Sequence, residues 1–562
     1  MKGLFNHFCT CTHSSHLHKW TDISPYNRGP KPTLLPEPHI KTQLFKQRYH
    51  VLHQRLLRNE SFLPPTFSAI TKRTSSGISQ HYTITPISHL LGHNSSTFLL
   101  FGVLTIAPTG ILSLTDSTGS ISLDLAYATP VPLDGAYFTP GCFVLVDGVY
   151  SEDPMKFTVL TIGMPPCERR EASAEIYGHV DFLGTGLTID PATVQHKALR
   201  RMETIVGCKW IFLSEVELDV DRTFDALRAI FGEYDSSSPP LVCVLMGNFI
   251  RVPFHGSLLG RASTTPTQGS ISYKENWDRL ALLLSDFPNI VKSTTFIFVP
   301  GDNDPFTSTF SGGRTALLPR EAVPEYFVNR VKRVLTTGSS TSNTGLGAPP
   351  QNVAVDSETR GGVWTTNPAR VSYLSQEIVL FRDDALARFS RSAIRFPKVP
   401  TDISASTSTS AATTATNDQT TEPEPMNLDL DQDLPPSHTT LPPLQLPPAP
   451  LLKARKLVKT LLDQGHLSPF PLTTRPLLWD YAPHTLSLYP LPSLLVLADT
   501  GIDPFAVTYE GCHVVNPGRL LPCPVGCSGS SGGVGGGMAG WVEYDVALGR
   551  GTVKEVQVGV GI

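Results

Sequence analysis

The sequence is poor in charged residues and has no excess of basic ones. Only 17% of the 562 residues are charged, and 45 Lys and Arg against 49 Asp and Glu give a formal net charge of −4. Proteins whose main partner is a nucleic acid usually carry a basic excess, so this balance favours a protein surface as the main partner. No apolar run is long enough to span a bilayer, and a membrane is therefore not expected among the partners.

Several motifs of common enzyme classes are also missing. The nine cysteines follow neither a disulfide framework nor a paired zinc spacing, which favours reduced thiols in the cytosol or nucleus. No Gly-x-Ser-x-Gly turn follows a predicted strand, as an α/β-hydrolase would require. The glycines of 529–540 have no strand before them and no Lys-Ser or Lys-Thr after them, so they do not form a phosphate-binding loop. Nothing in the sequence calls for a cofactor.

What the sequence does contain is a regular alternation of strand and helix patterns between residues 206 and 306. Three short apolar runs typical of buried strands lie at 208–219, 241–249 and 295–306, and two amphipathic helix patterns lie between them at 221–234 and 273–287. This order predicts a parallel βαβαβ unit. The carboxyl ends of its three strands should meet at one edge of a sheet, where such folds place their ligand sites. A further strand pattern, GWVEYDVAL, lies near the end of the chain.

Each strand of the parallel unit ends in a polar turn. The polar side chains are Glu215 and Glu217 after the first strand, Asn248 after the second, and Asp302, Asn303 and Asp304 after the third. A two-metal hydrolase needs a bridging Asp and several imidazoles at such an edge, because these groups complete the metal shells and help to activate the attacking water. The turns contain carboxylates and amides but no imidazole. The sequence therefore predicts neither a catalytic residue nor a bound metal here.

The turns resemble those of the calcineurin-like metallophosphoesterases. That family has Asp-x-His, Gly-Asp-x-x-Asp and Gly-Asn-His turns after successive strands, and further histidines late in the chain. The corresponding turns here read Glu215-Val216-Glu217, Gly247-Asn248-Phe249 and Gly301-Asp302-Asn303-Asp304, and the late turn Asn516-Pro517-Gly518 also lacks an imidazole. The resemblance implies this fold, and the altered positions imply a catalytically inactive branch of it.

The second half of the chain resembles the B subunits of DNA polymerases alpha, delta and epsilon, and the epsilon branch in particular. The stretches that carry the resemblance are TTNPARVSYLSQEIVLFRDD at 365–384, LDQGHLSPFPL at 462–472, and LYPLPSLLVLAD with GCHVVNPG within 488–518. With the strand segments described above, the resemblance extends in patches from about Thr42 to Leu520. These stretches are long enough to be specific for the family.

The resemblance implies a non-catalytic accessory subunit that acts in chromosomal DNA replication in the nucleus. It would scaffold the zinc-binding C-terminal region of the catalytic subunit of DNA polymerase epsilon. Small histone-fold subunits and replicative helicase components would be further partners, and DNA would be contacted through the complex. Two alternatives stay open, namely the B subunit of DNA polymerase delta or alpha and an active metallophosphoesterase.

The predicted architecture is an OB-fold β-barrel packed on an inactive phosphoesterase-like domain, a β-sandwich with flanking helices in an α+β or α/β arrangement. Its segments are a flexible N-terminal segment at 1–40, a helix at 41–64, the OB-fold at 81–165, the phosphoesterase-like domain at 172–400 and 451–562, and a disordered insertion at 401–450. The barrel segment is poor in Lys and Arg between Phe98 and Asp153. This favours a structural or protein-binding barrel over one that binds single strands.

An apolar, aromatic segment at 477–499 supplies the candidates for a partner-facing surface. These candidates are Trp479, Tyr481, Leu488, Tyr489 and Leu491. A fold without catalytic metals does not need an open substrate cleft, so such side chains are free to contact another subunit. The alternative is that they belong to the hydrophobic core of the domain itself.

Overall fold

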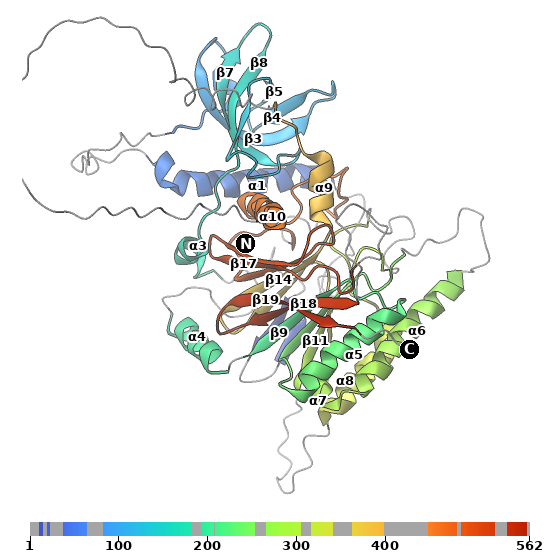
Figure 1. Ribbon diagram of the computed structural model, residues 1–562. Coiled ribbons are helices and arrows are strands. Elements are labelled where there is room, and N and C mark those ends of the chain that lie inside the picture. Colours follow the sequence, from blue (N-terminus) through green and yellow to red (C-terminus); the bar gives the residue numbers. More distant parts are fainter. Residues whose placement is uncertain are drawn as a thin grey trace, which may run out of the picture.

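The structure is a computed structural model with three β-sheets and the helices that cover them (Figure 1). It describes residues 10–14, 19–22, 37–63, 82–180, 193–206, 208–252, 266–304, 316–340, 362–397, 448–479, 485–522 and 537–558. The predicted insertion at 401–450 lies outside these ranges except for its last three residues, 448–450. In the described part of the chain, no helix is both long enough and apolar enough to cross a membrane.

One sheet closes into a small barrel. Its strands are β3 (Thr97–Ile106), β4 (Leu112–Thr115), β5 (Ser120–Asp124), β6 (Thr129–Val131), β7 (Phe143–Ser151) and β8 (Lys156–Gly163). The strand order is β5-β4-β3-β7-β8-β6, and a parallel pairing between β5 and β8 closes the ring. Alternate residues of β3 and β7, such as Leu100 and Val146, fill its interior because successive side chains of a strand point to opposite faces. The barrel predicted from the short strand patterns is confirmed.

The first sandwich sheet contains the predicted parallel unit. Its order is β12-β11-β10-β9-β18-β19, formed by β12 (Val363–Trp364), β11 (Thr295–Val299), β10 (Val242–Met246), β9 (Lys209–Ser214), β18 (Met538–Asp545) and β19 (Arg550–Gln557). β9, β10 and β11 are parallel and in register, since Val242 pairs with both Trp210 and Thr295. The strand pattern GWVEYDVAL corresponds to β18. The sequence pattern does not predict β19, because its charged residues leave only a weak apolar alternation.

The second sandwich sheet packs face to face on the first. Its order is β16-β17-β15-β14-β13-β1-β2, formed by β16 (Phe505–Tyr509), β17 (Cys512–Asn516), β15 (Leu494–Ala498), β14 (Gln376–Arg382), β13 (Ala369–Tyr373), β1 (Thr10–Ser14) and β2 (Lys19–Asp22). One core cluster joins the two sheets, with Phe212 and Val244 from the first and Leu380 and Val496 from the second. The two sheets are therefore the inner layers of a sandwich.

The strands β1 and β2 correct the expectation of a flexible segment at 1–40. β1 pairs in parallel with β13, and β2 pairs antiparallel with β1, so both extend the second sandwich sheet. The expectation rests on the lack of apolar periodicity in this segment. An edge strand, however, is recruited by the free backbone groups of its neighbour and needs no apolar alternation of its own.

Helices cover both outer faces of the sandwich. The helices of the described residues are α1 (Pro38–Arg58), α3 (Arg170–Tyr177), α4 (Val194–Val206), α5 (Asp221–Ser236), α6 (Pro266–Ser285), α7 (Pro288–Ser293), α8 (Glu325–Ser340), α9 (Ala385–Ser392) and α10 (Ala449–Gln464), with 3-10 turns at Glu60–Phe62 and Ile87–Leu90. α5 to α8 pack on the first sheet, and α9 and α10 pack on the second (Figure 1). The second half of the chain thus has four layers, helix, sheet, sheet and helix.

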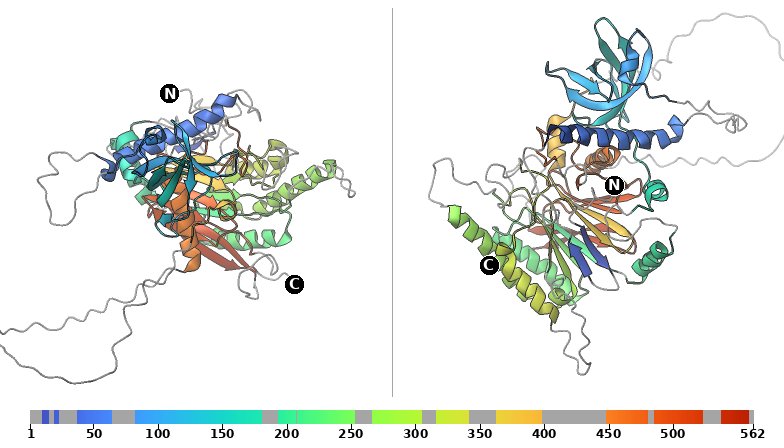
Figure 2. Two further views of the ribbon diagram at one scale, coloured as in Figure 1. Left: turned by 90° about the horizontal axis from the view of Figure 1, so that it is seen from above. Right: turned by 180° about the vertical axis from the view of Figure 1, so that it is seen from behind.

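Helix α1 lies between the barrel and the sandwich, as the view from behind also shows (Figure 2). Its Leu44 belongs to the core cluster of α9 and α10, whereas Leu52 and Leu56 pack against Phe101 and Phe143 of the barrel. α10 completes this junction, because the Gln464 side-chain amide donates to the carbonyl oxygen of Phe143 at 2.7 Å and its oxygen accepts from the Phe143 N–H at 2.8 Å. The amide thus replaces a strand partner at the barrel wall.

Candidate functional site

The ends of β9, β10 and β11 bring most of the predicted polar side chains together. Glu215 is buried with φ of 56°, in the left-handed region that a side chain rarely adopts. Its carboxylate accepts from the backbone N–H of Asn248 at 3.1 Å and from the Asn248 amide at 3.2 Å. The Asn248 side-chain oxygen in turn accepts from the N–H of Asn303 at 2.9 Å. The clustering that parallel topology predicts is therefore present.

Asp304 caps the loops of this cluster. Its carboxylate accepts from the N–H of Gly301 at 2.7 Å, the N–H of Phe249 at 3.2 Å and the hydroxyl of Tyr273 at 3.2 Å. Burial raises the pKa of Asp304 to about 7, because the charged form loses its hydration. The side chain therefore stabilises the turn after β11 and has few lone pairs left for a metal.

Glu217 lies at the rim of the cluster. Its carboxylate accepts a hydrogen bond from the Arg251 side chain at 2.9 Å. Burial, and to a smaller extent the negative charge of the nearby Glu215, raises the pKa of Glu217. Asn303 donates its amide to the carbonyl oxygens of Ile250 and Arg251, at 3.3 and 2.9 Å. Glu217 thus connects the turn after β9, and Asn303 the turn after β11, with the segment that follows β10.

Arg382, at the end of β14, places its guanidinium group against Glu215. The two groups approach to 2.6 Å, and the Arg382 Nη1 atom also contacts Asp384 at 3.2 Å. Although burial alone would lower it, Asp384 and Glu215 raise the pKa of Arg382 well above its usual range. The second sandwich sheet therefore supplies the positive charge that compensates the Glu215 carboxylate of the first.

Arg475 and Arg388 occupy the space beside the turn after β11. Arg475 binds Asp302 with two parallel hydrogen bonds of 3.1 and 2.8 Å, the geometry of a guanidinium and a carboxylate that face each other. Arg388 binds Asp383 at 3.1 Å and lies 3.7 Å from Asp302. Arg475 also approaches Asp383, at 3.4 Å. All four side chains are buried.

Three guanidinium groups therefore fill the pocket at the strand ends, which we call the arginine-filled pocket (Arg382, Arg388 and Arg475 with Glu215, Asp302 and Asp383). Its carboxylates are already paired, so they cannot bind a divalent cation without first losing an arginine. In the residues that the structure covers, no three or more His, Cys, Asp or Glu side chains form a group that could hold a metal ion. The pocket is built for internal charge pairing.

Sequence reasoning missed these arginines. One signal was available for Arg382, because it follows the apolar run of β14 directly and precedes Asp383 and Asp384, as polar turns follow β9 and β11. The turn Asn516-Pro517-Gly518 is likewise a polar turn at a strand end, that of β17 in the second sandwich sheet. There Asn516 donates its amide to the carbonyl oxygen of Asp499 at 3.0 Å and accepts from the Gly518 N–H at 2.9 Å, a structural cap.

Two of the five candidates for a partner-facing surface require correction. Leu488 and Leu491 are buried in the core cluster beneath α10, which leaves neither side chain free for a partner. Tyr489 is half-buried, donates to Glu168 at 2.7 Å and accepts from Arg58 at 2.7 Å, so it connects α1 to the sandwich. Trp479 is half-buried under Lys41 of α1. Tyr481 lies outside the described residues.

Comparison with known proteins gives the family of the chain. Residues 210–507 match the profile of the DNA polymerase alpha/epsilon B subunits, and residues 38–166 match the OB-fold domain of DNA polymerase epsilon subunit 2-like proteins. The closed barrel is thus an OB-fold. The chain is 35% identical to the B subunit of DNA polymerase epsilon from Schizosaccharomyces pombe, covering 87% of this chain and 68% of the relative.

Other relatives agree with this result. The B subunit of DNA polymerase epsilon from Saccharomyces cerevisiae is 35% identical, with 87% of this chain and 66% of the relative covered. DNA polymerase epsilon subunit 2 of Homo sapiens is 30% identical, with 87% and 74% covered. The chain thus spans about two thirds of the length of the two yeast relatives. It belongs to the family of DNA polymerase alpha/epsilon B subunits, and to the epsilon branch of that family.

Proposed function

We propose that this chain is the accessory subunit of a DNA polymerase epsilon and that it has a scaffold role without catalytic activity of its own. It would hold the zinc-binding C-terminal region of the catalytic subunit in the nucleus and connect it with small histone-fold subunits and replicative helicase components. DNA would be contacted through the assembled complex. The second half of the chain would then be a calcineurin-like phosphoesterase fold whose metal site has been lost.

The arginine-filled pocket is the observation that carries the inactive assignment. Hydrolysis by two metals requires carboxylates and imidazoles that are open to the ions and to water. Glu215 and Asp302 instead face guanidinium groups at 2.6 and 2.8 Å. Positive charge is thus supplied by side chains that cannot lower the pKa of a water molecule as a metal does. An active metallophosphoesterase is disfavoured for this reason.

A groove shared by the barrel and the sandwich offers a place for the large partner. It has a volume of about 990 Å³ and is lined by the barrel loop before β7, α10 and β16. Leu133 of the loop is 77% exposed and Leu452 of α10 is 45% exposed, and Lys453, Arg455 and Lys456 lie beside them. An apolar surface with a basic rim suits a protein partner with a matching acidic rim. We assign the C-terminal region of the catalytic subunit to this groove.

Co-purification tests the scaffold role. The full chain should retain the catalytic subunit, and Leu133→Asp and Leu452→Asp should each weaken this retention. Leu282→Asp is the matched control, because Leu282 is 53% exposed on α6, far from the groove. Equal retention by all three folded variants would remove the groove from the interface, and failure of the unaltered chain to retain any polymerase catalytic subunit would refute the scaffold role.

A separate assay tests the inactive assignment. The purified chain with Mn²⁺ should show no turnover of an aryl phosphate or of single-stranded DNA. Turnover that is lost in Asp302→Asn would show that a metal displaces Arg475, and would overturn the assignment. Binding of the alpha or delta catalytic subunit in place of epsilon would assign the chain to another polymerase.

A further inference from the structure

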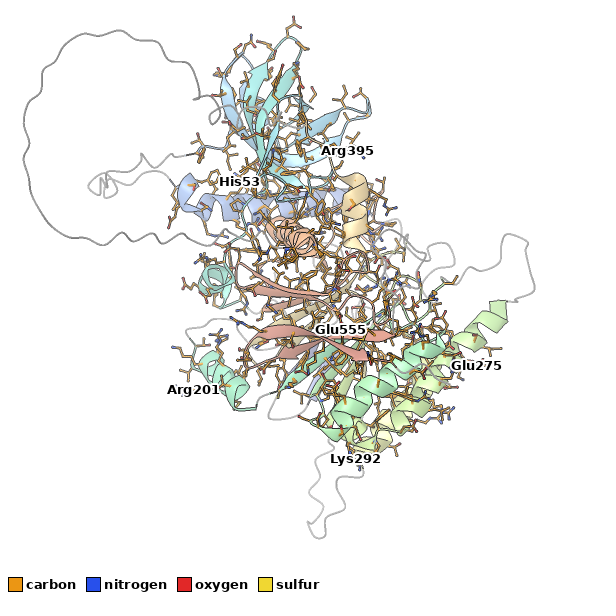
Figure 3. The ribbon with its side chains drawn as sticks, in the orientation of Figure 1. His53, Arg201, Glu275, Lys292, Arg395 and Glu555 are labelled. Carbon is orange, nitrogen blue, oxygen red and sulfur yellow. The ribbon has the colours of Figure 1, made fainter. Side chains whose placement is uncertain are left out.

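A second polar cavity lies on the other side of the sandwich, beside α3 and α4. It has a volume of about 190 Å³, and Arg170 of α3, Arg200 of α4, Ser493, Gly511 and His513 are among its lining residues. Figure 3 labels Arg201, the neighbour of Arg200 on α4, and shows this helix at the edge of the sandwich. None of these residues belongs to the arginine-filled pocket.

Arg170 has no counter-ion within the described residues. Its Nε atom is buried without a hydrogen-bond acceptor, and no ion pair to a described carboxylate is formed by its guanidinium group. The neighbouring Arg169, by contrast, pairs with Glu510 at the surface. Burial lowers the pKa of Arg170, which reflects the cost of holding this charge away from water. A partly buried guanidinium group with no acceptor at hydrogen-bond distance is compensated when an anion binds it.

The nearby carboxylates are hydrogen-bonded or paired with groups other than Arg170. Glu203, at the cavity wall, accepts from the N–H and the hydroxyl of Ser375 at 2.8 and 2.6 Å. Glu377 attracts Arg170 but forms no ion pair with it, and is bound instead to Arg370 at 2.7 Å. The guanidinium groups of Arg170, Arg200 and Arg370 thus face two carboxylates, which leaves one positive charge over.

His513 does not alter this balance. Its Nδ1 atom contacts the Thr508 hydroxyl at 2.8 Å, and its Nε2 atom accepts from the N–H of Gly551 at 2.9 Å. Because the Nε2 atom accepts a hydrogen bond, the ring is neutral. Burial, and to a smaller extent the positive charge of the nearby Arg550, lowers the pKa of His513 and keeps the ring neutral at physiological pH.

From these contacts we propose that the cavity is a binding site for a phosphate-type oxyanion, which we call the α3–α4 anion site. Arg170 would bind the anion with the two Nη donors of its planar group, a geometry that suits two oxygens of one phosphate. Arg200 would close the site from solvent, since it is exposed and also lines a neighbouring cavity of about 440 Å³. The same chemistry fits free phosphate and a phosphate ester. This inference does not depend on the scaffold role.

Calorimetric titration of the full chain with inorganic phosphate, at constant ionic strength, tests the site. We expect one phosphate per chain, with binding weakened about tenfold or more in Arg170→Met and about threefold in Arg200→Ala, because each removes a charged donor. Arg228→Ala is the control, since Arg228 is an exposed arginine of α5 in a surface pair with Asp225. Arg200 is exposed, so its variant tests the site even if Arg170→Met fails to fold.

Two further titrations, with phosphoserine and with acetate, identify the class of ligand. Phosphoserine that binds more tightly than inorganic phosphate, and that depends on Arg170 in the same way, would identify a phosphate ester as the ligand. Acetate that binds as tightly as phosphate would overturn the proposed ligand class. Absence of phosphate binding in the unaltered chain, or equal binding by Arg170→Met and Arg228→Ala, would overturn the site.

Discussion

Replacement of Arg475 by methionine should destabilise the fold strongly. Arg475 is fully buried and Asp302 is 5% exposed, and the two are joined by hydrogen bonds of 3.1 and 2.8 Å. Methionine fills a similar volume but supplies no charge. Asp302 would then keep Arg388, which lies 3.7 Å away, and the attraction of Arg320 and Arg382, and Asp383 would lose one of its two arginines. Removal of one partner from a buried ion pair typically costs about 3–5 kcal/mol, because the remaining charge is left without compensation.

Urea unfolding followed by tryptophan fluorescence measures this loss, since Trp210, Trp277 and Trp541 are buried in the sandwich cores. Arg228→Met is the matched control and should change the free energy of unfolding by less than about 0.5 kcal/mol, as expected for an exposed pair. Adding Asp302→Asn to Arg475→Met should recover part of the loss, because the uncompensated charge is then removed.

A cation should also recover part of the loss. If the guanidinium group of Arg475 acts as the counter-ion of Asp302 and Asp383, millimolar Mn²⁺ should raise the melting temperature of Arg475→Met and leave that of the unaltered chain unchanged. A loss below about 1 kcal/mol for Arg475→Met would refute the reasoning, since it would mean that these carboxylates need no buried positive charge.

Three further predictions concern pH, the barrel junction and the core. Burial raises the pKa of Asp304 and of Asp499 to about 7, so between about pH 4 and pH 7 the folded chain holds protons that the unfolded chain has released, and the free energy of unfolding should fall as the pH rises through this window. Asp499→Asn should flatten this slope in urea titrations at several pH values, and an unchanged slope would contradict the assignment. Gln464→Ala should cost about 2–3 kcal/mol, because it leaves the N–H and carbonyl of Phe143 unpaired, whereas the exposed Gln557→Ala should cost almost nothing. Leu488→Ala should destabilise the chain by about 2–5 kcal/mol without reducing partner binding of the folded fraction, and weaker partner binding at unchanged stability would return Leu488 to the interface.

The sequence predicted those parts of the site that lie close together along the chain. The alternation of strand and helix patterns in residues 208–306 predicts a parallel βαβαβ unit. In such a unit the carboxyl ends of the strands meet, which brings Glu215, Asn248 and Asp304 to one edge of the sheet. Local patterns cannot show which distant side chain compensates a charge. Arg382 is 167 residues from Glu215, and Arg475 is 173 residues from Asp302. These pairs depend on how the two sheets face each other, which no local period encodes.

Leu488 and Leu491 failed as partner-facing candidates for a related reason. Leu488 and Leu491 have the apolar character of both a core and an interface, and composition alone does not distinguish the two. Their position in the core depends on α10, which covers them and begins at Ala449, at the end of the predicted insertion. Tyr489 differs, because its hydroxyl reaches Glu168 and Arg58 and thereby fixes α1 to the sandwich.

The two hydrogen bonds between Phe143 and Gln464 cannot form until late in the synthesis of the chain. The two residues are 321 positions apart, so at about 5–20 residues per second a ribosome needs roughly 15–60 s to deliver Gln464 after Phe143 has been made. During that time the backbone groups of Phe143 must be hydrated or shielded by another protein. The nascent barrel therefore has one unpaired N–H and one unpaired carbonyl group at the start of β7 until the end of α10 has been made.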